Sequence, residues 1–179
     1  MWFKMASSLK RVMVFIDGSN FYYALKRSFS TTKIDFEKFC NFLSLNEDLV
    51  KIKYYNSTLN MEDDEVAYKK QQSFFDYLFE VPLMDIYFGR LEKRPGGLKA
   101  ERGVDVKLAV DLVVNAYKDN YDVAILVSND ADFIPAIEEV KALNKEVYYV
   151  GFPNMKSYHL NKVCSKTIKV NDISEYLRD

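Results

Sequence analysis

Four aspartates stand where predicted strands end or a predicted helix begins, which is where α/β proteins place reactive side chains. Asp17 follows the apolar segment VMVFI, and Asp130 and Asp132 come just after the apolar run VAILV. Asp105 falls in the first turn of a helical stretch, VDVKLAVDLVVNAY. Ligands of open α/β sheets bind beyond the carboxyl ends of the strands, at the point where strand order reverses. We therefore expect Asp17 and Asp130 to be neighbours, with the other two acids at the same edge.

Carboxylates gathered in this way need a counter-charge. Two unit charges about 4 Å apart repel by about 4 kcal/mol at an effective dielectric near 20. Ligands that are all oxygen, with no His or Cys, favour Mg²⁺ or Mn²⁺ over zinc. Such an ion suits phosphate esters, because it binds a phosphoryl oxygen, activates a water and stabilises the leaving oxygen. The pattern predicts a divalent-cation site in which Asp17, Asp105, Asp130 and Asp132 are both metal ligands and catalytic residues.

Each acid also has an explanation that involves no catalysis. Asp105 would be favoured by the helix dipole wherever it pointed. Asp132 would be a good N-cap for the helix that follows it, in which Pro135 is tolerated in the first turn. Asp111 lies six residues after Asp105, about 120° round the helix, so we expect it behind the site or on the surface.

Polar residues beside these acids are candidates for binding phosphate. Ser19 and Asn20 begin a predicted helix whose backbone N–H groups point at the same edge, and Ser128 adds a hydroxyl there. Simple N-capping by Ser19 or Asn20 is the alternative. Basic residues flank Asp105, and from these we select Arg94 and Arg102 as substrate-binding residues.

Strand and helix patterns alternate along the chain, which indicates an α/β fold. Five or six short strands are expected in all, at 11–16, 51–56, 84–91, 123–127, 147–151 and 167–170. Helical spacing occurs at 20–28, 35–43, 62–79, 104–117 and 133–143. Strands that are apolar on both faces belong in a mostly parallel sheet covered by helices on each side, a three-layer α/β/α sandwich. The Pro- and Gly-containing segment 94–103 is expected to be a long solvated loop.

Length and composition fit one domain. We expect a frayed N-terminal extension at 1–10 and a single domain at 11–179. The chain has a formal net charge of −1, so a nucleic-acid partner must be inferred from local charge. Two cysteines without metal-ligand spacing indicate a reduced, cytoplasmic protein, and no apolar run is long enough for a signal peptide or a membrane span.

Local features point to RNA as a partner, most readily single-stranded RNA. Exposed aromatics stack unpaired bases, and we expect Tyr22 or Tyr23 and Phe152 near the cleft. His159, the one histidine, has no Ser or Cys motif around it and does not suggest a nucleophilic triad. The apolar helical segment 68–79 leaves a homodimer open as an alternative to a core helix. Lysines also gather in the last part of the chain, where they are most simply solvated.

Three segments together resemble the NYN family, the LabA-like branch of the PIN-domain nuclease superfamily. They are FIDGSN at 15–20, RGVDVKLAVD at 102–111 and LVSNDADFIPAI at 126–137. The resemblance implies a PIN-like sheet, a metal-dependent ribonuclease activity and an acidic quartet at Asp17, Asp105, Asp130 and Asp132. The family commonly has Lys where this chain has Arg102, which keeps the charge.

Three other functions compete with a nuclease. The first is a catalytically silent module of the same fold that binds RNA or protein. The second is a phosphatase acting through a phospho-aspartate, but that chemistry normally has an acid two residues after the nucleophile, where this chain has Ser19. The third treats the Asp130-Ala-Asp132 pair as the metal-binding motif of a glycosyltransferase, which leaves Asp17 and Asp105 without a role.

Overall fold

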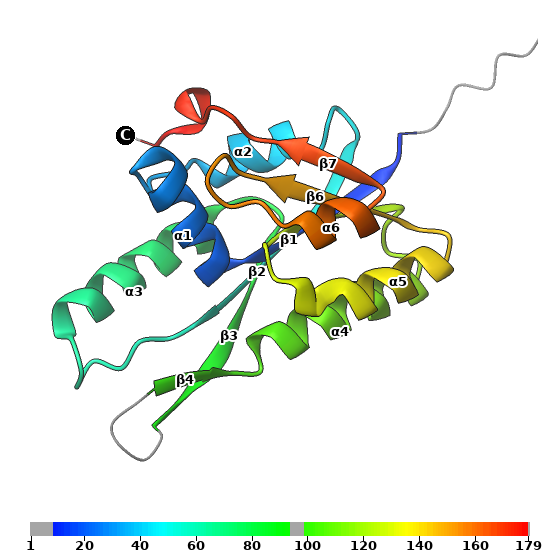
Figure 1. The fold of residues 1–179 in the computed structure, drawn as a ribbon. Helices are drawn as coiled ribbons and strands as arrows, with labels where there is room; N and C mark the ends of the chain where they lie inside the picture. The colour runs from blue at the N-terminus through cyan, green and yellow to red at the C-terminus, as the bar shows by residue number, and fades with distance from the viewer. Residues whose placement is uncertain (1–8, 94–98, 179) are drawn as a thin grey trace, which may run out of the picture.

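The protein is described by a computed structural model that places residues 9–93 and 99–178, with the backbone alone for 90–93 and 99–102. The strands are β1 (Arg11–Asp17), β2 (Asp48–Ser57), β3 (Met84–Lys93), β4 (Lys99–Arg102), β5 (Val123–Val127), β6 (Glu146–Gly151) and β7 (Lys166–Lys169). The α-helices are α1 (Gly18–Phe29), α2 (Phe36–Leu43), α3 (Glu65–Glu80), α4 (Val104–Tyr117), α5 (Ile134–Ala142) and α6 (Tyr158–Val163). Short 3₁₀ turns cover Ala131–Phe133 and Ser174–Tyr176. Figure 1 shows these elements in chain order.

One sheet, in the order β4-β3-β2-β1-β5-β6-β7, runs through the centre of the fold. Every neighbouring pair is parallel except β3 and β4, which are antiparallel. The prediction of a mostly parallel sheet in an α/β fold is confirmed. The prediction that 94–103 is a loop throughout was wrong, because residues 99–102 pair with β3. These four residues, KAER, are mostly polar, and an edge strand, which pairs on one side, needs no apolar pattern.

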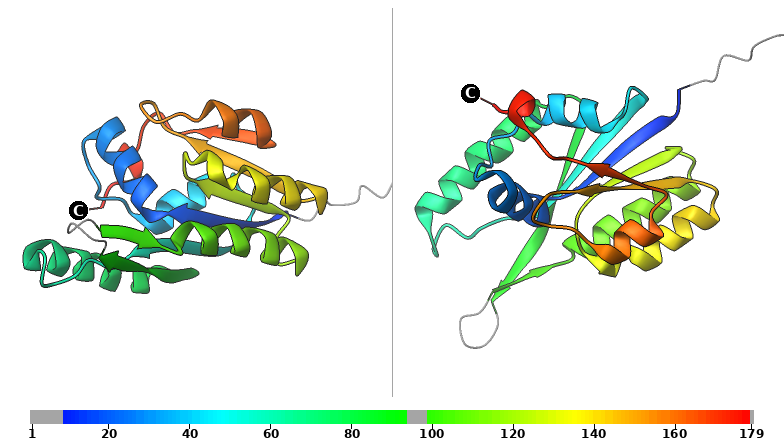
Figure 2. Two further views of the ribbon diagram at one scale, coloured as in Figure 1. Left: turned by 60° about the horizontal axis from the view of Figure 1, so that its bottom comes forward. Right: turned by 45° about the horizontal axis from the view of Figure 1, so that its top comes forward.

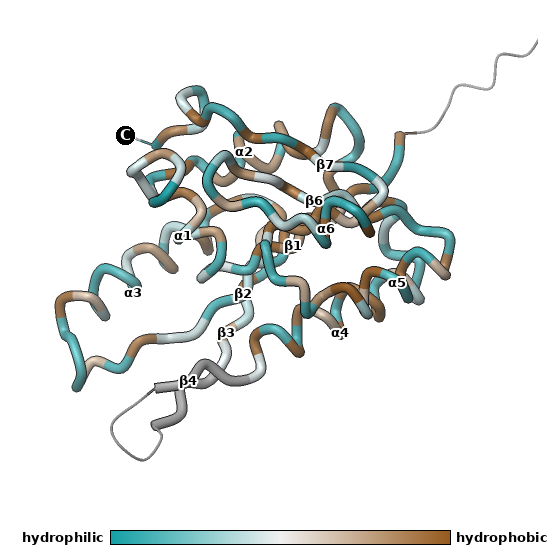
Figure 3. The backbone as a smooth tube through the Cα atoms, in the orientation of Figure 1, coloured by the Kyte–Doolittle hydropathy of each residue, from teal (hydrophilic) through white to brown (hydrophobic). Residues whose placement is uncertain are grey.

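Two cores lie on opposite faces of the sheet, as the alternation of side chains along β1 requires. Val12, Val14 and Ile16 pack on one face with residues of α1, α2 and α3. Met13 and Phe15 pack on the other face with residues of α4, α5 and α6. Figure 2 shows the helices on both sides of the sheet, and Figure 3 shows hydrophobic stretches along the central strands and α4. The expected three-layer arrangement is therefore present.

Strand order fixes where the site can form. β1 lies between β2 and β5, with Ile16 beside Val127 in the last register pair of β1 and β5. The chain leaves both strands at the same edge and enters α1 and the 3₁₀ turn before α5. The expected adjacency of Asp17 and Asp130 follows from this pairing.

The predicted N-terminal extension, 1–10, lies almost wholly outside the described residues. Lys10, which is described, donates its backbone N–H to Glu47 Oε2 at 2.7 Å and forms an ion pair with Glu146. The first described residues are therefore joined to β2 and β6.

Candidate active site

Asp17 ends β1 and is buried, with 6% of its surface exposed. Its Oδ1 accepts a hydrogen bond from the Asn20 backbone N–H at 3.0 Å, which makes Asp17 the N-cap of α1. Its Oδ2 accepts a hydrogen bond from Ser128 Oγ at 3.0 Å. The carboxylate thus starts a helix and joins the ends of β1 and β5.

Ser128 continues the connection to the acids that follow β5. Its Oγ accepts a hydrogen bond from the Asp130 backbone N–H at 3.2 Å, and Asp130 Oδ1 accepts one from the Asp132 N–H at 2.9 Å. Asp130 is therefore the cap of the 3₁₀ turn. The alternative in which Asp132 caps the next helix was wrong, since α5 begins after Phe133, which makes no side-chain cap bond. Asp132 is exposed and its carboxylate has no capping role.

Asp105 reaches the same group from α4. The helix begins after Gly103, whose φ of 81° lies in the left-handed region that glycine tolerates best. Asp105 is exposed to solvent, and its pKa is raised by partial desolvation and then by the negative charges of Asp130 and Asp132. Asp105 therefore lies close enough to these two acids, 25 and 27 residues further on, to be repelled by them.

The acids do not form a closed metal cage. Within the part of the chain that the structure places, no group of three or more His, Cys, Asp or Glu residues is arranged to hold a metal ion. An ion here would keep several water ligands, as Mg²⁺ usually does in proteins.

The backbone N–H groups of α1, expected to receive a phosphate, are partly used by the protein. The Asn20 N–H donates to Asp17, and α1 starts at Gly18, two residues before the predicted start. Ser19 Oγ lies 3.4 Å from Asn56 Oδ1 at the end of β2. Neither Ser19 nor Asn20 is the cap, so the capping alternative for these two residues was wrong.

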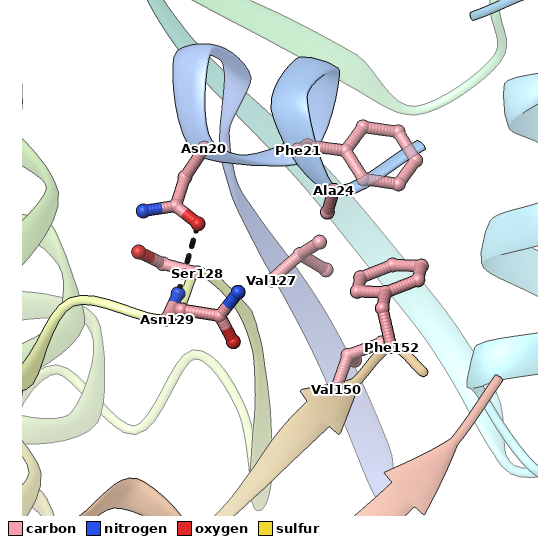
Figure 4. A pocket seen from close by; sticks show the side chains of 8 residues that line it. All are labelled: Asn20, Phe21, Ala24, Val127, Ser128, Asn129, Val150 and Phe152. Carbon is pink, nitrogen blue, oxygen red and sulfur yellow. Dashed lines mark hydrogen bonds between the residues drawn. The ribbon is translucent and has the colours of Figure 1, made fainter. Parts of the chain in front are cut away.

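Asn20 instead joins α1 to β5. Its Oδ1 accepts a hydrogen bond from the Asn129 N–H at 3.1 Å, beside a shallow, mostly apolar depression that Phe21 and Phe152 help to line (Figure 4). Asn129 Oδ1 in turn accepts a hydrogen bond from Tyr149 Oη. No pattern in the sequence selects Asn129 or Tyr149, apart from the position of Asn129 just after a buried strand.

The residues predicted to contact RNA differ in how the structure places them. Arg94 lies outside the described residues, and only the backbone of Arg102 is described, at the end of β4. Phe152 is buried, with 2% exposed, and packs against Phe21, so it cannot stack a base as expected. Tyr22 and Tyr23 are both exposed.

Asp111 was expected behind the site or on the surface, and the structure buries it, with 7% exposed. It accepts hydrogen bonds from Tyr55 Oη at 2.8 Å and Lys107 Nζ at 2.5 Å, and Lys53 Nζ lies 3.5 Å away. Burial alone would raise the pKa of Asp111, but the hydrogen bonds and the charge of Lys53 together lower it. These four residues, the Asp111 cluster, join α4 to β2.

Two further expectations concern surfaces. Among the described residues, no helix is long and apolar enough to cross a membrane. In α3, Phe75 and Leu78 are buried and Phe74 is packed against the same core, while Val66 and Phe79 are exposed. The apolar residues of this helix are therefore largely accounted for by the core.

Comparison with known proteins agrees with the geometry. The NYN domain family matches residues 11–173. The low amplitude and bright protein LabA of Synechococcus elongatus is 22% identical over 175 residues, covering 97% of this chain and 90% of LabA. An uncharacterised protein of Methanocaldococcus jannaschii is 35% identical over 69 residues, and the match spans 38% of this chain and 29% of that protein.

A solved structure shares the fold. The crystal structure of a protein of unknown function from Vibrio parahaemolyticus superposes with a TM-score of 0.76 at 22% identity, covering 97% of this chain and 99% of that one. The family match extends over almost the whole chain and includes all four aspartates. The chain belongs to the NYN domain family, which is related to the PIN-like nucleases.

Proposed function

We propose that this protein is a metal-dependent ribonuclease that hydrolyses RNA phosphodiesters at the carboxyl edge of its sheet. The observation that carries the proposal is the hydrogen-bonded path from Asp17 through Ser128 to Asp130, with Asp105 close enough to have its pKa raised by Asp130 and Asp132. Membership of a PIN-like nuclease family supports the same reaction class.

The four candidate ligands suit Mg²⁺ or Mn²⁺. All four are carboxylates, and mutual repulsion among them would be relieved by a divalent cation. Asp17, Asp105, Asp130 and Asp132 would hold the ion, directly or through water. When bound, such an ion neutralises charge on a phosphodiester and makes a bound water more acidic.

The chain's own residues supply the positioning. Ser128 fixes Asp17 and the backbone of Asp130 relative to each other through two hydrogen bonds. Asp132, which is exposed and does not cap α5, accepts a hydrogen bond from the attacking water and orients it.

A second candidate is a silent module of the same fold that binds RNA without cleaving it. It is favoured by the use of Asp17 as a helix cap and by the lack of a three-ligand group in the described part of the chain. Under this alternative, the acids stabilise the fold and the metal has no role.

The test is single-turnover cleavage of a labelled single-stranded RNA with Mn²⁺. Wild type is compared with Asp130→Asn, which keeps a capping side chain, and with Glu139→Gln, an exposed change on α5, as the matched control. Cleavage that is lost in Asp130→Asn and kept in Glu139→Gln supports the nuclease. RNA binding without cleavage by any of the three proteins supports the silent module, and equal cleavage by all three excludes this site.

A further inference from the structure

The outer face of α1 carries two exposed aromatic residues that the core does not need. α1 buries Gly18, Phe21, Ala24 and Leu25 against the sheet. Tyr22 and Tyr23 lie on the other side, with 44% and 53% of their surfaces exposed. Their rings touch edge to face, with centroids 5.4 Å apart. The helix therefore presents an aromatic pair to solvent beside the site.

Each of these rings has a cation one helical turn further on. Lys26 Nζ lies 5.7 Å from the centroid of the Tyr22 ring, and Arg27 Cζ lies 6.0 Å from that of Tyr23. Within the described part of the chain, neither cation forms a salt bridge, and α1 contains no acid. The positive charge on this face is thus left for a ligand. We call Tyr22, Tyr23, Lys26 and Arg27 the α1 face.

The α1 face is continuous with the acids. α1 begins directly after Asp17, and Ser19, which lies beside Asn56 at the end of β2, falls on the same side of the helix as Tyr23 and Lys26 at 100° per residue. Tyr22 and Tyr23 come five and six residues after Asp17, which is about 8–9 Å along a helix axis.

The orientation of α1 is fixed by its surroundings. Asn154 Nδ2 donates to Arg27 O at 2.9 Å, which joins the end of α1 to the turn after β6. At the other end, Asp17 caps the first turn, and Asn20 accepts a hydrogen bond from the Asn129 N–H, two residues after β5. In Figure 1, α1 leads away from the edge at which β1 ends. A ligand that lay along this helix would be directed to the acids.

We propose that the α1 face binds single-stranded RNA and guides it to the acidic site, with Tyr22 and Tyr23 stacking on bases and Lys26 and Arg27 binding phosphates. Bases stack on aromatic rings irrespective of sequence, and cations beside the rings match the adjacent backbone. Unpaired bases are needed, because a duplex hides the faces that would stack. The inference rests on the proposed function in one respect, that the acidic site to which the RNA is guided cleaves it. RNA binding by the α1 face itself does not depend on catalysis.

The experiment is fluorescence anisotropy of a labelled 12-nucleotide RNA in EDTA, where cleavage cannot contribute. Tyr22→Ala/Tyr23→Ala should weaken binding by at least about 30-fold, because each stacked base contributes at least about 1 kcal/mol. Tyr22→Phe/Tyr23→Phe should bind as wild type does, because the rings remain. Tyr117→Ala, which removes a tyrosine that is 79% exposed at the far end of α4, is the control and should leave affinity unchanged.

The charges are tested separately by salt dependence. Lys26→Ala/Arg27→Ala should reduce the slope of log K against log salt by about 1.4, since each phosphate contact to a single strand contributes about 0.7. Lys118→Ala, at the end of α4, should leave the slope unchanged. Thermal melts of each variant establish that these exposed substitutions leave the fold intact.

Four results would overturn the inference: no RNA binding by wild type, undiminished binding by Tyr22→Ala/Tyr23→Ala, an unchanged slope in Lys26→Ala/Arg27→Ala, or equal affinity for duplex RNA. Equal affinity for DNA of the same sequence would overturn the assignment to RNA. Binding without cleavage by wild type would remove the ribonuclease and leave the α1 face standing. Cleavage with binding unaffected by the tyrosines would remove the α1 face and leave the ribonuclease standing.

Discussion

Asp111→Asn should destabilise the protein strongly, although Asp111 lies apart from the proposed chemistry. Its carboxylate accepts hydrogen bonds from Tyr55 and Lys107 and lies beside Lys53. The amide that replaces it has one acceptor oxygen, and its NH₂ group would face a donor. Lys53, whose side chain is 20% exposed, would then be left beside a neutral partner.

The size of the effect follows from burial. Removing one partner of a buried ion pair costs about 3–5 kcal/mol, and because Lys107 is partly exposed and can turn to water we expect about 3 kcal/mol for Asp111→Asn. Tyr55→Phe removes one hydrogen bond to a charged acceptor that keeps its lysines, and should cost about 1.5 kcal/mol. The double variant should be less destabilised than the sum by about 1 kcal/mol, because the two side chains share a hydrogen bond.

Urea denaturation followed by circular dichroism gives these free energies of unfolding. Asp85→Asn is the control, because Asp85 pairs with Lys51 at 3.1 Å on the surface and should contribute less than about 1 kcal/mol. The pKa of Asp111 is lowered in the fold, so its contribution is present above the unfolded value near 4 and is lost as pH falls through the lower folded value. The difference between wild type and Asp111→Asn should therefore shrink in acid.

An Asp111→Asn protein as stable as wild type, or one no less stable than Asp85→Asn, would refute this reasoning. Either result would mean that water stabilises Lys53 and Lys107 as well as the Asp111 carboxylate does. The placement of α4, and with it Asp105, would then depend on apolar packing alone.

Three further predictions concern the site and its supports. Asp105→Asn should raise the melting temperature in EDTA by about 2 °C, because it removes the repulsion that raises the pKa of Asp105. It should also abolish any rise in melting temperature that Mn²⁺ causes in wild type, and an unchanged response to Mn²⁺ would count against the metal site. Gly18→Ala would place a Cβ 2.6 Å from Tyr54 Cζ and should cost about 1–3 kcal/mol in urea denaturation, so a neutral result would mean that the ring moves freely. Arg11→Met should cost about 1 kcal/mol near neutral pH, because Arg11 pairs with the carboxylates of Asp122 and Asp119 and lowers the pKa of both. That contribution is present above the unfolded value near 4 and is lost as pH falls through the lower folded values, so the cost should shrink in strong acid; a cost that did not change with pH would refute the electrostatic explanation.

Most of the fold could be predicted because its strands are buried on both faces. The runs ending at Ile16 and Val127 are apolar throughout, and such runs occur in parallel sheets. β4 and α6 could not be predicted in the same way. β4 is an edge strand that pairs on one side, and α6 is six residues long and buries Leu160, so neither leaves a periodic pattern.

The sequence could predict which strand ends lie together at the candidate site, but not which hydrogen bonds form there. The order of β1 and β5 follows from a general property of doubly wound sheets, and it brings Asp17 to Asp130. The identity of each cap was not predictable, because several polar residues in succession can cap a helix and only the backbone path selects one. For Asp111 the sequence left two places open, behind the site or on the surface, since the helix angle gives a direction but not the Lys53 and Tyr55 of β2 that lie there and bury it.

These contacts decide which substitution can test the chemistry. Asp17 has one oxygen on the α1 N-cap and the other on Ser128, so Asp17→Ala would damage the fold and the site together and could not separate them. Among the residues that the structure describes, the Asp130 carboxylate caps a 3₁₀ turn, and an asparagine can cap that turn while removing the charge. Loss of cleavage in Asp130→Asn, with the urea midpoint unchanged, would therefore identify the missing charge as the cause. A loss of stability equal to that expected for an Asp17 variant would instead show that the acids of this edge serve the fold first.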